Sequence, residues 1–106
     1  MKPLKFIGSS LIALRTFPAD ARRTAGFELN FVQRGLPPSD WKPLPAIGPG
    51  VREIRIHSSG EWRVIYVANF FEAVYVLHAF AKKARRAPSR EIALARNRYR
   101  QLGELR

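Results

Sequence analysis

The stretch VREIRIH (residues 51–57), SSG (58–60) and EWRVIYVA (61–68) decides the fold of this chain. Apolar and polar residues alternate in the first run and at the start of the second, and this period of two is typical of strands with one face on a core. The three residues between the runs fit a hairpin loop, with Gly60 where a left-handed residue is needed. The sequence therefore predicts two antiparallel strands joined by a tight turn.

Pairing the two strands about this loop predicts which side chains share a face. Arg55 is expected to face Arg63, and His57 to face Glu61. The other face is apolar and covers a core, with Ile54, Ile56, Trp62, Val64 and Tyr66. Two opposed arginines repel each other, so either Glu53 and Glu61 relieve the pair or an external anion does. The alternatives are a solvated, charge-balanced hairpin and a phosphate site on an open sheet face, and in neither do the arginines matter for folding.

The remaining segments predict an α+β domain that spans residues 1–106. EAVYVLHAF (72–80) completes a three-stranded antiparallel meander. An N-terminal edge strand within 2–7 and two helices, one near residues 11–14 and one from about 18 to 34, precede it, and a C-terminal helix that starts at Pro88 or Ser89 follows. The proline-rich segment 35–50 is expected to be an irregular connector. We expect the helices to lie on one face of the sheet.

Composition limits the functions that this chain can perform. Lys and Arg number 19 against 8 Asp and Glu, and the net charge of +11 favours a polyanionic partner such as RNA or DNA. The absence of cysteine excludes disulfides and thiolate metal sites. His57 and His78 have no carboxylate cluster around them in the sequence, so we expect no metal and no cofactor. No apolar stretch is long enough to cross a membrane and no secretory signal is visible, which predicts a cytoplasmic protein without a membrane partner.

A basic segment follows the third predicted strand of the meander. No acidic residue lies between Glu72 and Glu91, and the gap contains Lys82, Lys83, Arg85, Arg86 and Arg90. A run of this kind is either a solvated loop or a binding site. Its position at the end of a strand favours a function, because a rigid sheet can hold charged groups at fixed distances.

The order and spacing of several motifs resemble the RelE/ParE toxin superfamily, in its HigB-like, phage-related branch. These motifs are GLPP (35–38), KPLP (42–45), IGPGVREIR (47–55), WRVIY (62–66) and VYVLHAFAKK (74–83). The resemblance implies a toxin of a type II toxin-antitoxin system with a small sheet flanked by helices. Such a toxin is a cytoplasmic RNase that cleaves mRNA, often on the ribosome, and a cognate antitoxin, expected here to be a helix-turn-helix protein, silences it. The oligomeric state stays open.

The resemblance also assigns roles to residues of this chain. Arg63, Lys82 and Lys83 are the expected catalytic residues, and Arg55, Arg85, Arg86 and His57 are expected to bind RNA. The implied reaction is attack of a ribose 2′-hydroxyl on its adjacent phosphate, with Arg63 on the phosphate and one of the two lysines as base or charge stabiliser. Ala84 and Ala87 stand where this branch commonly has threonine, which removes a possible phosphate contact and a helix cap.

Two other functions remain compatible with the sequence. The chain could inhibit DNA gyrase through protein contacts, as ParE-like toxins do, or it could be an inactive module that binds nucleic acid or an antitoxin. The sequence favours the RNase, because opposed arginines on a sheet suit phosphate chemistry.

Overall fold

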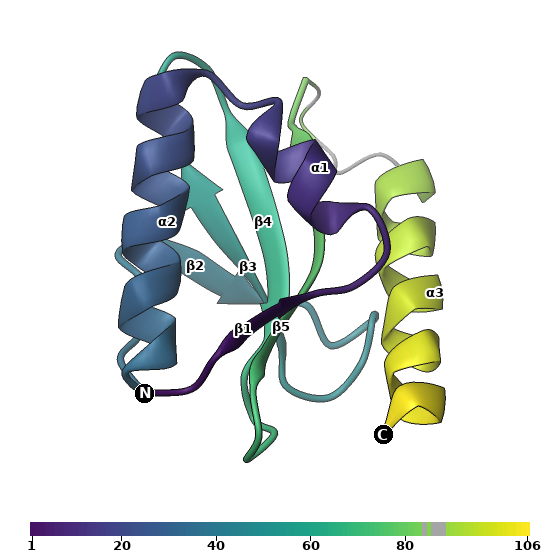
Figure 1. Cartoon of the computed structure of the whole chain (residues 1–106). Helices are drawn as coiled ribbons and strands as arrows, with labels where there is room; N and C mark the ends of the chain where they lie inside the picture. The colour runs from purple at the N-terminus through teal and green to yellow at the C-terminus, as the bar shows by residue number, and fades with distance from the viewer. Residues whose placement is uncertain (84, 86–88) are drawn as a thin grey trace.

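The computed structural model describes residues 1–83, 85 and 89–106, which form a five-stranded sheet and three helices (Figure 1). The elements in chain order are β1 (Leu4–Phe6), α1 (Ser10–Arg15), α2 (Ala19–Gln33), β2 (Trp41–Pro43), β3 (Val51–Ile56), β4 (Trp62–Val67), β5 (Val74–Ala81) and α3 (Ser89–Leu105). The predicted α+β class is confirmed. No helix in the described part of the chain is long and apolar enough to cross a lipid bilayer.

The strand order in the sheet is β1-β5-β4-β3-β2. The predicted meander of β3, β4 and β5 is antiparallel throughout, whereas β1 pairs with β5 in parallel. The prediction that 35–50 lacks regular structure is wrong, because β2 pairs with β3 inside this segment. The three residues of β2 are too few for an alternating pattern to be recognised in a segment with five prolines. Pairing with β3 stabilises this short strand.

The register of the β3–β4 hairpin is the one that the sequence predicts. Arg55 pairs with Arg63, flanked by the Ile54–Val64 and Ile56–Trp62 pairs. In the loop, Gly60 has a positive φ of 127° as expected, and Ser59 also lies in the left-handed region with a φ of 54°. The predicted side-chain faces of the hairpin are therefore confirmed.

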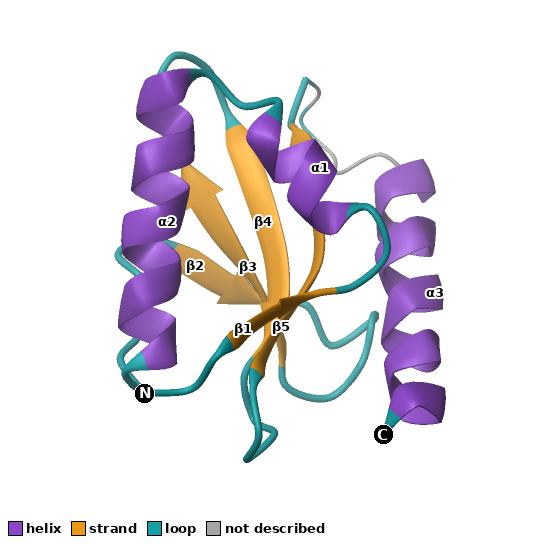
Figure 2. Cartoon of the chain, viewed as in Figure 1, coloured by secondary structure: helices purple, strands orange, loops and turns teal. Residues whose placement is uncertain are grey.

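Helices cover both faces of the sheet, and the expectation of a single covered face is wrong (Figure 2). On one face, Ala25 and Leu29 of α2 share a core with Ile54, Val64 and Tyr66. On the other face, α3 contributes Ala95 and Leu102 to a second core that includes Val51, Ile65, Val67 and Leu77. β5 is buried at seven successive positions, which fits a strand with both faces covered.

A buried network ties α3 to the sheet and to the turn before α1. Arg98 of α3 donates to the carbonyl of Leu77 (2.9 Å), to Nδ1 of His78 (3.2 Å) and to the hydroxyl of Ser9 (2.8 Å). The Nε2 atom of His78 lies 3.1 Å from Glu91. Burial lowers the pKa of His78, so the ring is neutral, accepts from Arg98 and donates to Glu91. His78 is thus a hydrogen-bonded residue of the core.

The buried Glu28 of α2 fixes the start of β2. Its carboxylate accepts hydrogen bonds from the backbone N–H (2.8 Å) and the hydroxyl (2.7 Å) of Ser39. The next residue, Asp40, accepts from the backbone N–H of Arg55 through its carbonyl at 2.8 Å. Glu28 thus holds the connector in a position that places the Asp40 side chain at the sheet.

Candidate functional site

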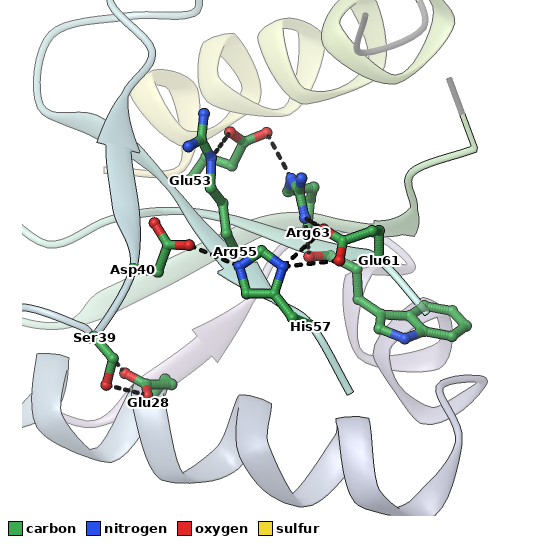
Figure 3. Close-up of polar contacts among 9 residues, drawn as sticks. Glu28, Ser39, Asp40, Glu53, Arg55, His57, Glu61 and Arg63 are labelled. Carbon is green, nitrogen blue, oxygen red and sulfur yellow. Dashed lines mark hydrogen bonds and ion pairs between the residues drawn. The ribbon is translucent and has the colours of Figure 1, made fainter. Parts of the chain in front are cut away.

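Charged side chains of three neighbouring strands gather on the α3 side of the sheet, beyond the area that α3 itself covers (Figure 3). We call this surface the charged face, and it consists of Asp40, Lys42, Glu53, Arg55, His57, Glu61 and Arg63. Strand alternation explains its composition, because Val51 and Ile65 lie two residues from members of this set and belong to the core under α3.

The carboxylate of Glu53 lies between the two opposed arginines. Its Oε2 atom is 3.7 Å from Nε of Arg55, and its Oε1 atom is 3.9 Å from Nε of Arg63. The ammonium of Lys42, directly across on β2, is also 3.7 Å away. Glu53 is buried, so its charge acts on the arginines with little screening. Of the two alternatives that the sequence left open, internal relief of the arginine pair is therefore present in the structure.

The charged face is open at Arg55 and closed at Arg63. The side chain of Arg55 is 33% exposed, whereas that of Arg63 is only 6% exposed. The expectation of an open face is wrong for Arg63, because α3 packs two residues further along β4 and the buried Phe80 is its cross-strand neighbour. Arg63 Nη1 donates to the Trp62 carbonyl (2.9 Å) and to Glu61 (3.2 Å). The burial of Arg63 and its ion pairs with Glu53 and Glu61 argue against the expectation that it does not matter for folding.

His57 bridges two carboxylates at the exposed end of the charged face. Its Nε2 atom lies 2.7 Å from Asp40, and its Nδ1 atom lies 2.8 Å from Glu61. The hydrogen bond to Asp40, followed by that to Glu61, raises the pKa of His57. The hydrogen bond from His57 in turn lowers the pKa of Glu61. When both ring nitrogens carry protons, His57 is a cation fixed between two acceptors.

Of the basic residues predicted after β5, Lys82 is the one that backbone pairing places beside this surface. The backbone N–H of Lys82 donates to the Glu61 carbonyl at 2.8 Å, which continues the β4–β5 ladder by one residue. This pairing puts Lys82 opposite Glu61, on the side of the charged face. Lys83 and Arg85 are exposed beyond the strand, and Arg86 lies outside the described residues, as do Ala84 and Ala87.

Sequence reasoning missed Asp40 and Lys42 as members of this surface. Both precede β3 in the proline-rich connector, and their spacing of two was the only available signal. Among the described residues, no group of three or more His, Asp and Glu side chains is placed to hold a metal ion.

A five-stranded sheet, antiparallel except for β1 and flanked by three helices, is consistent with the small α+β fold of RelE-like toxins. A model of the phage-derived Gp49-like family (DUF891) matches residues 13–100. The chain therefore belongs to the Gp49-like family, which is a RelE/ParE-like toxin family associated with toxin-antitoxin systems. No curated protein matched the sequence.

Proposed function

We propose that this chain is a cytoplasmic mRNA endoribonuclease of the HigB-like branch, which works without a metal ion and which a cognate helix-turn-helix antitoxin silences. The observation that carries the proposal is the placement of Arg55 directly opposite Arg63, with Lys82 at the end of the adjoining strand. Arg55 and Arg63 lie on central strands of the sheet, and the backbone of Lys82 is held by its hydrogen bond to Glu61. Rigid cations at fixed spacing suit the stabilisation of charge that develops on a phosphate.

The contacts of Glu61 support a phosphate site in this place. Its carboxylate accepts from the His57 ring and from the Arg63 guanidinium, and its side chain is 45% exposed. Glu61 can therefore turn toward solvent, and a phosphate in its place would accept charge-assisted hydrogen bonds from the same two donors. Arg55, the more exposed arginine, would contact the RNA backbone beside them.

The proposed reaction uses the substrate's own nucleophile. The ribose 2′-hydroxyl attacks the adjacent phosphorus, the bond to the 5′-oxygen breaks, and a 2′,3′-cyclic phosphate and a 5′-hydroxyl result. Lys82 or Lys83 accepts the 2′-hydroxyl proton or stabilises the charge of the transition state. Arg63 holds the phosphate and assists the departing oxygen. Arg85 and Arg86 extend the cationic surface for the RNA strand, since they follow the lysines in sequence.

The test is cleavage of a defined mRNA by the purified protein, with and without ribosomes. We expect new 5′-hydroxyl ends and cyclic phosphates, and a Lys82→Met or Lys83→Met variant identifies the lysine that the reaction needs. The matched control is Arg100→Gln, an exposed position on the outer side of α3. Intact RNA in both conditions contradicts the proposal. If the same protein then blocks supercoiling by DNA gyrase, the ParE-like function replaces it, and if neither activity is found, the chain is an inactive binding module.

A further inference from the structure

A cavity of about 470 Å³ lies on the α2 side of the sheet, away from the charged face. It is lined by residues from the N-terminal segment, the end of α2, the connector and strands β3 and β4, among them Lys2, Leu36, Trp41, Arg52, Tyr66 and Asn69. Arg52 and Tyr66 are cross-strand partners, and Tyr66 belongs to the core under α2. The cavity and the charged face are therefore separated by the sheet.

Hydrogen-bond donors without a matching anion line this cavity. The Tyr66 side chain is fully buried, and its hydroxyl makes no well-formed hydrogen bond within the described part of the chain, although the Arg52 guanidinium lies beside it. Burial raises the pKa of Tyr66, which keeps the hydroxyl protonated. Arg52 and Lys2 add two positive charges, and none of the described lining residues carries a carboxylate. Buried polar groups are normally paired, so the unpartnered Tyr66 hydroxyl points to a ligand that accepts hydrogen bonds.

The walls of the cavity fit a carboxylate on an apolar stem. The Arg52 guanidinium lies 4.2 Å from the centre of the Trp41 ring, which fixes its plane at the edge of the cavity. Lys2 is held by a hydrogen bond of 2.6 Å from its Nζ to the Ala68 carbonyl. A planar guanidinium held in this way can bind a carboxylate through two parallel hydrogen bonds.

A second, shallower groove of about 670 Å³ adjoins the cavity and shares Lys2 and Gly35 with it. Two of its lining side chains are apolar and almost fully exposed, with Phe71 at 95% and Met1 at 82%. The groove also contains the carboxylate of Glu72, which ion-pairs with Arg106 and has its pKa lowered to about 2 by that contact. The Arg106 guanidinium compensates the negative charge of Glu72, so this ion pair adds no net charge to the groove.

We propose that the cavity and the groove together bind an acidic segment of a partner polypeptide, with one carboxylate against Arg52, Lys2 and the Tyr66 hydroxyl, and apolar side chains on Met1 and Phe71. The net charge of +11 favours an acidic partner and opposes a second copy of this chain. The proposal does not depend on nuclease activity, because the charged face lies on the other side of the sheet.

The test uses an array of short peptides with one or two glutamates among leucine and alanine, and a matched array with glutamine in place of glutamate. We expect at least one glutamate peptide to bind the full chain and its glutamine counterpart to fail. Arg52→Gln and Tyr66→Phe should each weaken this binding about tenfold, because each removes a donor to the carboxylate. Tyr66→Phe removes only an unpaired hydroxyl and should fold, which its thermal unfolding transition checks.

The control variants are Arg22→Gln, an exposed arginine on α2, and Arg55→Gln on the charged face. Both should bind the glutamate peptide as tightly as the original chain does. Absence of glutamate-dependent binding, or binding that survives both cavity substitutions, overturns the proposal. An RNA oligonucleotide that loses affinity in Arg52→Gln but not in Arg55→Gln overturns it as well, since nucleic acid would then occupy the cavity.

Discussion

Glu53 and Arg63 form a buried ion pair between neighbouring strands, with 3.9 Å between Arg63 Nε and Glu53 Oε1 and both side chains almost fully enclosed. The same carboxylate faces Arg55 and Lys42. Removal of this carboxylate takes away the anion that three cations share and leaves the buried Arg63 with its contact to the more exposed Glu61. The stability of the sheet therefore depends on Glu53.

We predict that Glu53→Gln lowers the free energy of unfolding by about 3 kcal/mol, the cost of breaking a buried pair from one side. Urea denaturation measures this change. Glu104→Gln, at an exposed position near the end of α3, should change it by no more than about 0.5 kcal/mol. Equal stability of the two variants would contradict the ion-pair interpretation.

Arg55→Gln should separate activity from stability. Its side chain is one-third exposed, so its ion pair with Glu53 contributes at most about 1 kcal/mol to folding. Loss of a charged contact to the RNA backbone beside the reacting phosphate should lower kcat/KM for RNA cleavage about tenfold. The comparison is Arg100→Gln, which should cleave at the unmodified rate. If the two variants cleave equally, Arg55 has no part in the reaction.

Cleavage of a purified RNA should continue in an excess of chelator, because the proposed reaction assigns every charge to side chains of the chain. The measurement is the rate with and without chelator on an RNA that is cut in the absence of ribosomes, since ribosomes need magnesium of their own. Loss of cleavage that one divalent ion restores would refute the metal-free reaction.

The dependence of stability on pH should reflect His57. The pKa of His57 is raised above the usual 6.5 by Asp40 and Glu61. Its contribution to the free energy of unfolding is therefore complete below pH 6.5 and is lost as the pH rises through the higher pKa of the folded state. The pKa of Glu61 is lowered, so its contribution is lost only as the pH falls through that lower value. The midpoint of thermal unfolding, measured between about pH 5 and pH 9, should decrease on the alkaline side of this range. His57→Gln should flatten that fall, and an unchanged slope would show that other groups cause it.

Gly8→Ala should destabilise the attachment of α3. Gly8 has a φ of +58°, and a Cβ there would lie 2.7 Å from Nε of Arg98. The strained backbone and the displaced guanidinium together should cost about 2 kcal/mol. Gly26→Ala in α2 is the opposite case, because a Cβ there meets no atom within 4 Å. It should stabilise the protein by up to about 1 kcal/mol, and the two unfolding free energies should move in opposite directions.

The sequence predicts the β3–β4 hairpin correctly because both determinants are local. The alternation around Ile54 and Val64 sets the faces, and Gly60 sets the turn and hence the pairing of Arg55 with Arg63. β2 could not be recognised in the same way, because its pairing with β3 depends on contacts outside the segment. Glu28 illustrates the same limit, since its partner Ser39 lies in that connector.

The sequence predicts which side chains of the hairpin share a face, but not how exposed that face is, and it does not predict that Asp40 and Lys42 join it. Arg55, His57, Glu61 and Arg63 share one face, as alternation requires. Whether that face is open depends on where α3 packs, and α3 is attached to the neighbouring part of the sheet through Arg98 and the second core. Amphipathic helices do not specify which side of a sheet they cover, so the burial of Arg63 followed from tertiary structure alone.

Both edges of the sheet are short. β1 and β2 have three residues each, Pro3 precedes the first, and Pro43 ends the second. Beyond β1, side chains donate hydrogen bonds to β5 in place of a neighbouring strand. The Ser10 hydroxyl donates to the Val76 carbonyl, and the Arg98 guanidinium donates to the Leu77 carbonyl. An incoming strand therefore meets only a short, proline-flanked strand at either edge. Edges of this kind oppose edge-to-edge pairing with other chains, and with it the fibril-like stacking of sheets.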